Sequence, residues 1–591
     1  TKFEGLTPER RWLLNSLLLP VFDQAKNLWQ HPPLRSRPRQ LSQLNRFREK
    51  NIWLALEEAI ELWTSAFQAR LPEGGRLPLV KFPLPPPEGG GITVYDGKLK
   101  DLQAELRAPD SRWGAEDMNT PSFQAAAMVT ALPRPNQAYW TLSALWAGWL
   151  WGSEMTESFK SVLRRRRYDW GWHCTALSAA FEHLVSLLPQ AGPAFAIIGE
   201  SEPGYLAAAL LAGAGTGLKL QGLAGRQQLS QAQIHWYNTN PGAVPADLAP
   251  SQYQEMLAQK GNLALQGYLK KRGEPAQFSQ LHAVMLADIL QAADFRLPQG
   301  LPVVDVLSQT QTTLLRTVQN NSSLAHLGGS ERSAESGQWF ASPAMLAELK
   351  PGEMAIPLAD QVEMSVVRSL IAHPVYTAAD LEQAVLQQYP GLLTPEQEII
   401  HACLESYAEQ VTVADKDTPA RENADKKISW VLRDQDQPTS RRKDIQEIDD
   451  RLVKIGERLG YKVKHTQPAT AGSRQALIWQ DTNGQIEALF FILASAVMGG
   501  VNSQLEGTLQ KHKLEQPRLK ALVVPGGRAR LIHIKLQNNL ALKNSVEAQW
   551  LFLKFRFVRR LAENDQITRA ILYSQLAQDP LANSDPQIPL W

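Results

Sequence analysis

Residues 123–140 read FQAAAMVTALPRPNQAYW, and this stretch decides how the first half of the chain is interpreted. An apolar run ends at Thr130, a proline-rich turn follows, and the chain then enters an aromatic helical pattern. Short apolar runs and longer helical patterns alternate on both sides of it. Because strands that alternate with helices form parallel, doubly wound sheets, the pattern predicts such an α/β sheet. The strands are expected at 92–97, 125–131, 194–200 and 218–223, and the helices at 139–151 and 174–188.

Turn-rich segments and shifts of pattern divide the rest of the chain into regions. Helical periodicity precedes the segment PLPPPEGGG, which marks the first boundary. Further on, three short helical patterns and a hairpin predict a winged helix. A helix, three strands, a helix and a strand then predict a second α/β region. The expected regions are helical (1–90), α/β (91–235), a helical and irregular connector (236–355), winged helix (356–435), α/β (436–565) and a polar tail (566–591).

The bulk composition narrows the class of protein. A chain of 591 residues is too long for one hydrophobic core, so several domains are expected. No apolar run is long enough to span a bilayer, and no signal-peptide pattern is present, so we expect no membrane partner. The net charge of +2 gives no global field for nucleic acid, although local basic clusters remain candidates. The two cysteines, Cys174 and Cys403, lie in different regions, which predicts no disulfide framework and a cytoplasmic location.

The stretch TALPRPNQAYWTLSALWAGWL at 130–150 resembles the catalytic turn and following helix of the prokaryotic adenine-specific, amino-group DNA methyltransferases. In that family an Asp or Asn, two prolines and an aromatic residue follow a sheet strand. The polar groups accept hydrogens from the target amine, and the aromatic ring stacks on the flipped base. The resemblance spans roughly residues 91–226 and implies a Rossmann-like methyltransferase half-domain. It also implies that Asp96 lies near the adenine of S-adenosylmethionine.

The sequence departs from this family at the catalytic positions. Ala131 stands where the Asp or Asn is needed, Pro133 keeps the second proline, and Arg134 replaces the aromatic residue. An alanine accepts no hydrogen bond, and losing such a preorganised partner costs about 10²–10³ in rate. Losing the stacking ring costs a further ~1–3 kcal/mol. We therefore expect no methyl transfer by this chain alone, and Asp96 is expected to be vestigial.

The cofactor side of the resemblance is also incomplete. The family's glycine-rich loop should precede the strand at 92–97, but the region before it offers only PEGG and PEGGG in proline-rich turns. The segment GAGTG at 213–217 lies between a helix and a strand. A phosphate loop needs the reverse order, so a helix C-terminus is expected there. We expect no cofactor, unless a partner chain supplies the missing half and S-adenosylmethionine binds.

The region 444–535 resembles the PD-(D/E)xK nuclease fold in the order and spacing of its elements. Such nucleases hold magnesium through an Asp that opens the second strand and through acidic residues of the third. This chain has Ala476, Phe491 and Leu493 at those positions. Asp481 and Glu487 flank TNG, which is typical of a hairpin turn. The resemblance therefore implies a restriction-endonuclease-like fold without a metal site.

Basic clusters are the remaining candidates for contact with DNA phosphates, although a run of charge is often only a solvated surface. The third helical pattern of the winged helix, EQEIIHACLESYAEQ, carries four glutamates and no cation, which is a poor groove-reading surface. His173 is expected to be a core histidine. The candidate nucleic-acid-binding residues are Arg164, Arg165, Arg166, Arg167, Arg441, Arg442, Lys443, Arg528, Arg530, Lys554, Arg556, Arg559 and Arg560.

These features together predict a catalytically inactive, methyltransferase-like and nuclease-like subunit of a prokaryotic DNA modification, restriction or anti-phage system. Its expected partners are DNA and other protein subunits, including an active enzyme. One alternative is a DNA methyltransferase that a partner chain completes. The other is a structural subunit that binds only protein.

Overall fold

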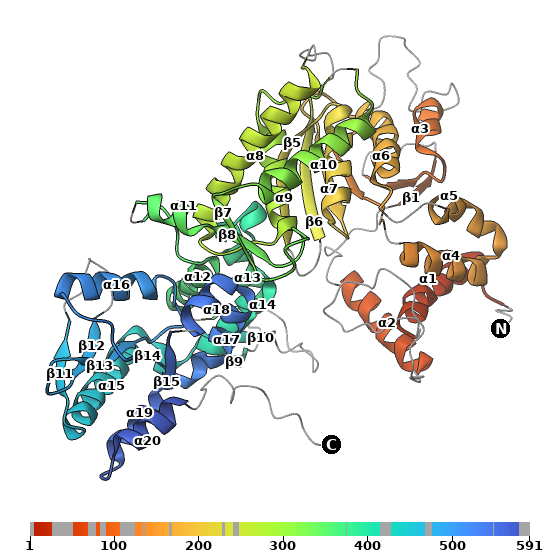
Figure 1. Ribbon diagram of the computed structural model, residues 1–591. Coiled ribbons are helices and arrows are strands. Elements are labelled where there is room, and N and C mark those ends of the chain that lie inside the picture. Colours follow the sequence, from red (N-terminus) through yellow and green to blue (C-terminus); the bar gives the residue numbers. More distant parts are fainter. Residues whose placement is uncertain are drawn as a thin grey trace. The chain divides into compact units, whose positions relative to one another are not determined.

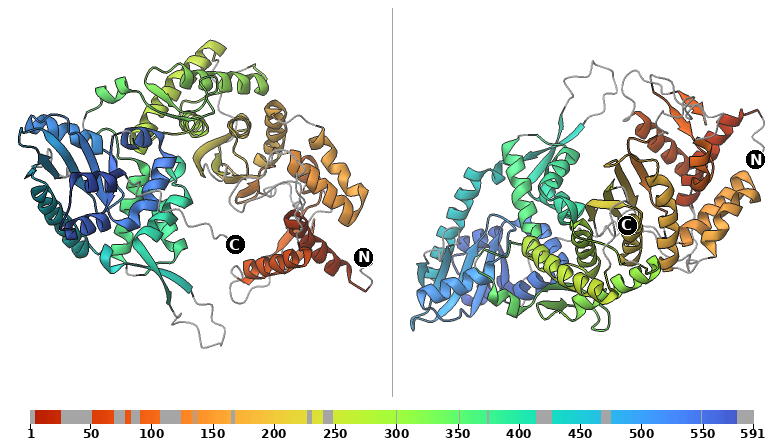
Figure 2. Two further views of the ribbon diagram at one scale, coloured as in Figure 1. Left: turned by 60° about the horizontal axis from the view of Figure 1, so that its bottom comes forward. Right: turned by 90° about the horizontal axis from the view of Figure 1, so that it is seen from above.

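The computed structural model describes most of the chain, and it mixes helices with several sheets (Figure 1), which confirms the expected α/β class. Two compact units are formed, Thr1–Gly261 with Met285–Leu314 and Asn262–Val284 with Leu315–Trp591. Figure 2 gives two further views of the same ribbon. The described residues are 5–25, 51–68, 78–82, 90–106, 124–133, 135, 137–164, 168–226, 231–239, 248–298, 300–350, 352–373, 375–413, 427–466, 475–547 and 549–577.

The first unit begins with helices and continues into the α/β region. The rings of Trp12 and Trp151 stack with their centroids 5.4 Å apart, and Phe22 meets Trp149 edge-on at 6.0 Å. The aromatic helix α4 therefore packs against α1. The elements are α1 (Pro8–Ala25), α2 (Ile52–Gln68), β1 (Leu79–Lys81), β2 (Ile92–Val94), α3 (Leu99–Leu106), β3 (Met128–Ala131), α4 (Gln137–Trp151), α5 (Lys160–Leu163), α6 (Trp170–Val185), β4 (Pro193–Ile198), α7 (Pro203–Gly215), β5 (Leu218–Arg226) and β6 (Gln231–Asn238).

The expectation of one parallel sheet in this region is wrong. The strand order is β3-β4-β6-β5: β3 and β4 are parallel, whereas β6 runs antiparallel to both of its neighbours. The strand expected at 92–97 forms as β2, but it pairs only with β1, in a separate parallel pair. The pattern QAQIHWYN alternates with a period of two and forms β6, yet the expected boundary at 235 falls inside it.

Helices α6 and α7 pack on one face of this four-stranded sheet. Trp236 of β6 is fully buried, and its ring meets Phe181 of α6 at 5.6 Å. Gly213 of α7 lets the same indole approach, because a Cβ there would lie 3.2 Å from Trp236 Nε1. Along β4 the side chains alternate between buried and exposed, and Val129 of β3 is 77% exposed. One face of the sheet is therefore covered, and the outer face of β3 and β4 is open.

The connector expected to be helical and irregular is largely ordered structure. Its three long helices are followed by an antiparallel hairpin and one short helix. The Tyr253 and Thr310 hydroxyls form a buried hydrogen bond of 2.9 Å between the first and third of these helices. The elements are α8 (Pro250–Arg272), α9 (Phe278–Gln291), α10 (Val303–Gln319), β7 (Leu324–Leu327), β8 (Gln338–Ala341) and α11 (Pro343–Glu348).

Three helices and a two-stranded hairpin lie where the winged helix is expected, in the second unit. Thr377 caps the second of these helices, with its Oγ1 accepting from the Asp380 amide at 3.1 Å. Tyr376, just before that cap, forms an isolated antiparallel bridge with Trp430 of the hairpin. The elements are α12 (Leu358–Ala372), α13 (Ala378–Gln388), α14 (Gln397–Tyr407), β9 (Ala408–Val413) and β10 (Lys427–Leu432).

The remaining elements follow the expected order of helix, three strands, helix and strand, and a further strand extends the sheet. The order β11-β12-β13-β14-β15 is antiparallel as far as β13 and parallel from β13 to β15. The elements are α15 (Pro438–Arg458), β11 (Lys462–His465), β12 (Ala476–Gln480), β13 (Ile486–Ile492), α16 (Val501–His512), β14 (Leu519–Val524), α17 (Ala529–Asn538), α18 (Leu540–Glu547), β15 (Leu551–Lys554), α19 (Phe555–Glu563) and α20 (Arg569–Ala577).

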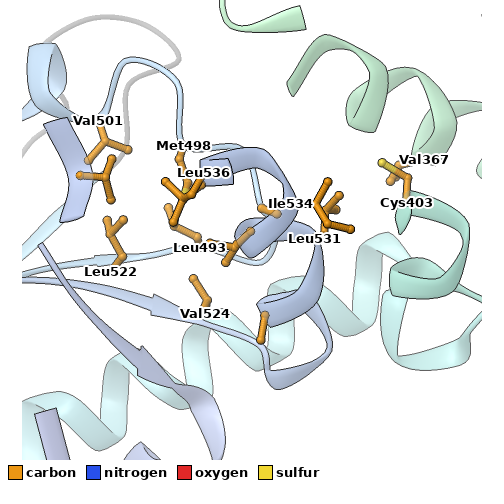
Figure 3. Packing of buried hydrophobic residues seen from close by; sticks show 14 of the residues in the cluster. Val367, Cys403, Leu493, Met498, Val501, Leu522, Val524, Leu531, Ile534 and Leu536 are labelled. Atoms are coloured by element: carbon orange, nitrogen blue, oxygen red, sulfur yellow. The ribbon is translucent and has the colours of Figure 1, made fainter. Parts of the chain in front are cut away.

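Strands β12, β13, β14 and β15 of this five-stranded sheet are buried on both faces, whereas the edge strand β11 is largely exposed. One face joins a core with α12, α14, α16 and α17, where Leu493 lies among Met498, Leu522 and Leu536 (Figure 3). The other face packs on α15 and α19. There a Cβ at Gly456 of α15 would lie 2.6 Å from the buried Trp479 Nε1, so the helix approaches the indole closely. The continuous apolar runs of these strands follow from burial on two sides.

Candidate functional site

The turn that resembles the methyltransferase motif follows β3 directly. Ala131 is exposed at the end of the strand, and Leu132 donates its amide to the Ile197 carbonyl at 2.9 Å. The Pro133 carbonyl accepts a hydrogen bond from the Tyr205 hydroxyl. Arg134 lies outside the described residues. This turn therefore presents no polar side chain at the position of Ala131, and its Pro133 carbonyl already accepts one hydrogen bond.

The features expected around a cofactor are separated. Asp96 is exposed just after β2, in the two-stranded sheet, and not at the end of a strand of the four-stranded sheet. The segment GAGTG forms the expected helix C-terminus: Thr216 Oγ1 donates to the Ala212 carbonyl at 3.1 Å, and Gly217 has a φ of 91°. Only glycine adopts that φ readily. The segment therefore ends helix α7. It does not form the loop before a helix that phosphate binding requires.

The reactive side chains near this turn are buried. His173 is 9% exposed between Trp172 and Tyr205, with ring centroids 4.9 Å and 5.3 Å away. Burial lowers the pKa of His173, which keeps the ring neutral and fits the expected core role. Cys174 is a free, buried thiol whose pKa burial raises to about 11. Neither side chain is placed to act as a nucleophile or a base.

The three positions that would carry metal ligands in a nuclease lie inside the core. Ala476 of β12 pairs directly with Phe491 of β13, and both are fully buried. Leu493, just past β13, is 2% exposed and belongs to the same apolar cluster. Asp481 instead forms the expected turn, accepting from the amides of Asn483 and Gln485 at 2.9 Å each. In the described residues, no three His, Cys, Asp or Glu side chains gather as metal ligands would.

A buried ion cluster connects α12 with α17, and sequence reasoning missed it. Lys535 Nζ lies 2.5 Å from Asp360 Oδ1 and also binds Glu363, which accepts a hydrogen bond from Tyr407. The Gly499 amide donates to Asp360 Oδ2 at 2.7 Å. Burial alone would lower the pKa of Lys535, but the two carboxylates raise it above the ordinary value.

This cluster is structural. All three charged side chains are at most 1% exposed, and each binds neighbours through hydrogen bonds, so no substrate reaches them. The sequence contains one indication of this cluster: its charged residues stand at positions of the helical pattern that are otherwise apolar. Asp360 and Glu363 are one helical turn apart in DQVEMSVV, and Lys535 ends the apolar run of RLIHIK. A polar residue on a core-facing helix side predicts a buried partner.

Most of the candidate cations of the second unit lie on its surface. Arg442 and Lys443, in the first turns of α15, are exposed, as are Arg530 and Arg560. Arg530 pairs with the half-exposed Glu405. In the first unit, Arg164 is exposed, whereas Arg165, Arg166 and Arg167 lie outside the described residues.

Two of the candidates are corrected by their burial. Arg528 is 2% exposed and Lys554 is 3% exposed, so neither presents its charge on an open surface. Arg528 pairs with the buried Asp436, its Nη1 lies 3.0 Å from Ser406 Oγ, and its guanidinium lies 3.5 Å above the Tyr407 ring. The pattern PGGRARLIHIK suggested a surface cluster because sequence alone did not show which arginine faces the core.

A cavity of about 150 Å³ lies at the carboxyl end of the parallel strands β13, β14 and β15. We call it the arginine pocket, defined by Asp436, Arg441, Gly526, Arg528, Arg556 and Arg559, which are among its lining residues. The pocket brings together cations that the sequence places in three separate clusters. Arg559 of α19 lies 3.1 Å from Asp444 and 2.9 Å from Glu447, both on α15. These two ion pairs connect the two helices.

Comparison with family models, curated proteins and solved structures gives no match to this chain. No helix in the described part of the chain combines the length and apolar character that a membrane crossing requires.

Proposed function

We propose that this protein is a catalytically inactive, methyltransferase-like and nuclease-like subunit that binds DNA in a prokaryotic DNA modification, restriction or anti-phage system. The observation that carries the proposal is the five-stranded sheet. Its strands and helices follow the order that the sequence predicts from its resemblance to the nuclease fold, and Ala476, Phe491 and Leu493, where that resemblance implies metal ligands, lie in an apolar core. Such a fold retains a scaffold for binding without the groups for magnesium chemistry.

The four-stranded sheet supports the methyltransferase-like part of the proposal. The sequence TALPRP follows β3, as the catalytic turn does in that family. Ala131 leaves that turn without a side-chain acceptor for a target amine, and the Pro133 carbonyl already accepts one hydrogen bond from Tyr205.

DNA contact is supported by the cations on neighbouring helices of the second unit. Arg442 and Lys443 lie in the first turns of α15, and Arg556 and Arg560 are exposed on α19, which packs against α15. The exposed side of α14 instead carries Glu398 and Glu405, which disfavours groove reading by that helix. We therefore propose that phosphate contacts dominate and that the protein binds DNA with little sequence preference.

Salt-dependent DNA binding by the full chain tests this proposal. If about six phosphates are engaged, the affinity should fall by about 10³ or more between 50 and 200 mM salt. Charge reversal at Arg442 and Lys443 should weaken binding, whereas the same change at the exposed Lys462 and Lys464 of β11 is the matched control. Binding that is absent, or equally weakened by both variants, would contradict the proposal. Cleavage of the duplex with magnesium would contradict the claim of inactivity.

The open outer face of the four-stranded sheet favours a second candidate, a methyltransferase completed by a partner chain. Val129, Phe195 and Ile197 expose 77%, 41% and 51% of their surface on β3 and β4. Large exposed apolar patches usually mark a protein interface. Calorimetric titration with S-adenosylmethionine separates the two candidates: the chain alone should give no heat, and heat that appears only with a copurified partner would support completion in trans. Both candidates place the protein in the cytoplasm, which suits its free, buried cysteines.

A further inference from the structure

We propose that the arginine pocket binds a terminal phosphate group, a phosphate monoester such as the end of a nucleic-acid strand. That the group belongs to nucleic acid rests on the proposed function, whereas the pocket's chemistry does not. The proposal concerns a site for an anion, at the edge of the same sheet whose metal-ligand positions have become apolar. It therefore assigns the nuclease-like region a ligand that needs no magnesium.

The backbone around the pocket suits an anion. Ala494 follows β13, Gly526 follows β14 and Phe555 follows β15, so the pocket lies beyond the carboxyl ends of three parallel strands, where α/β sheets bind ligands. The helical segment that begins at Gly526 and leads into α17 starts at the pocket, and α19 starts there at Phe555. The first amides of a helix have no acceptor within the helix, and they bind anions.

The sequence LVVPGGRARLIH contains this arrangement. It places a strand, a glycine pair and a helix in the order that a phosphate-binding loop needs, the opposite of the order at GAGTG. A Cβ at Gly526 would meet no atom within 4 Å, so open space lies beside this residue. A cavity of about 150 Å³ is well above the roughly 10–15 Å³ that one water molecule needs, so it has room for a phosphate group.

The side chains make the pocket positive and incompletely paired. Four arginines, Arg441, Arg528, Arg556 and Arg559, are among its lining residues, against two aspartates, Asp436 and Asp444. Arg528 is held by its own partners, and Arg559 binds Asp444. Arg441 Nε donates to the Asp436 carbonyl at 2.7 Å, but its buried Nη2 has no hydrogen-bond partner in the structure. That nitrogen can therefore donate a hydrogen bond to an anionic oxygen without first breaking another hydrogen bond.

Asp436 selects the kind of anion. Its side chain is only 5% exposed: Oδ1 binds Arg528, while the buried Oδ2 has no partner. A ligand that satisfies both orphan atoms must offer an oxygen acceptor to Arg441 and a hydroxyl donor to Asp436. A singly protonated phosphate monoester carries both, because its second pKa is about 6. Sulfate and a backbone phosphodiester lack the proton, so the pocket distinguishes the end of a strand from its interior.

Calorimetric titration of the full chain at pH 6 with inorganic phosphate and with sulfate tests the pocket. We expect phosphate to bind and sulfate to bind at least tenfold more weakly. Arg441→Gln should weaken phosphate binding by about 10–100-fold, the range for a hydrogen bond to a charged group. Asp436→Asn keeps the Oδ1 acceptor for Arg528 and should abolish the preference for phosphate over sulfate. No phosphate binding, or equal binding of the two ions by the unaltered chain, would overturn the proposal.

Gly526→Glu and Gly526→Gln form a pair of variants that does not depend on buried partners. The φ of Gly526 is not positive and the space beside it is open, so neither variant strains the fold. The added carboxylate should abolish phosphate binding, while the isosteric amide should weaken it less, at an unchanged melting temperature. Equal phosphate binding by Gly526→Glu and the unaltered chain would overturn the pocket assignment.

Oligonucleotides identify the source of the phosphate group. A single strand with a 5′-phosphate should bind more tightly than the same strand with a 5′-hydroxyl, and Arg441→Gln should remove the difference. If free phosphate binds but the two strands bind equally, the group comes from a free nucleotide or ion, and the nucleic-acid source is refuted while the pocket stands. If DNA binds without any preference for phosphate over sulfate, the proposed function stands and the pocket fails.

Discussion

The two larger sheets of the molecule differ in how many of their faces are buried. Along β4 of the four-stranded sheet, Ala194 and Ala196 are buried while Phe195 and Ile197 between and after them are exposed. Along β12 of the five-stranded sheet, all residues are buried. Both strands are apolar in sequence, although only one of them is buried on both faces. An apolar run therefore shows that a strand can be covered on both faces, and not that it is. Whether it is covered depends on helices that come from elsewhere in the chain, or from another chain.

The largest effect should come from an acidic residue on each sheet. Phe491→Asp, on the covered sheet, removes a ring worth about 3–5 kcal/mol and buries a carboxylate that costs several kcal/mol more. Phe195→Asp, on the open face, should cost only about 1 kcal/mol. Urea unfolding of the full chain measures both. Equal midpoints for the two variants would show that the covered and open faces do not differ as described.

Lys535→Met should destabilise the covered face of the five-stranded sheet, because it leaves Asp360 and Glu363 buried without their cation. Breaking a buried ion pair from one side typically costs about 3–5 kcal/mol, so α12 and α17 should separate at lower denaturant. Lys260→Met is the control, since Lys260 pairs with a largely exposed Asp294 and should cost less than about 1 kcal/mol. A loss as small as the control's would show that the cluster does not stabilise the covered face.

The same lysine predicts a dependence on alkaline pH. The folded pKa of Lys535 lies above its ordinary value, so its contribution to stability is fully present below the unfolded pKa of about 10.4. As the pH rises above that value toward the folded pKa, the contribution is lost. The stability difference between the unaltered chain and Lys535→Met should therefore begin to shrink above about pH 10.4. Thermal unfolding from pH 8 to 11 measures it, and a constant difference would contradict the assignment.

Alanine substitutions at the two glycines that contact tryptophans should change stability the least. Gly456→Ala would bring a Cβ to 2.6 Å from Trp479 inside the twice-covered sheet, which should cost about 1–3 kcal/mol through overpacking. Gly213→Ala brings its Cβ to 3.2 Å from Trp236, and the gain in helix propensity of up to about 1 kcal/mol offsets part of the crowding. Melting temperatures of the two variants should differ in this order. The reverse order would show that the half-open sheet is the less tolerant one.

The sequence predicted elements better than their pairing. The helices and strands of the region 356–565 follow the expected order because each has a strong local period. The direction of β6 was missed because a strand's partner depends on contacts far along the chain. For the same reason β2 was expected in the wrong sheet, although its position was right.

The candidate site was predictable only in part. That positions 131 and 476 carry no polar side chain could be read from the sequence directly, since both are alanines. The partners of Lys535 and Arg528 could not, because they lie 175 and 92 residues away in sequence. The loop PGGR carried a usable signal in its strand–glycine–helix order. The interpretation of the arginines in PGGRARLIHIK as one surface cluster does not use this order of elements.

Strand β3 ends the four-stranded sheet, and in the described residues its outer edge pairs with no other strand. An unprotected edge beside exposed apolar side chains is a template for unwanted strand addition. Expression of this chain alone should therefore give self-associated material at high concentration. Coexpression with a partner chain that covers this edge should reduce self-association. A higher yield of unaggregated protein would then identify that partner.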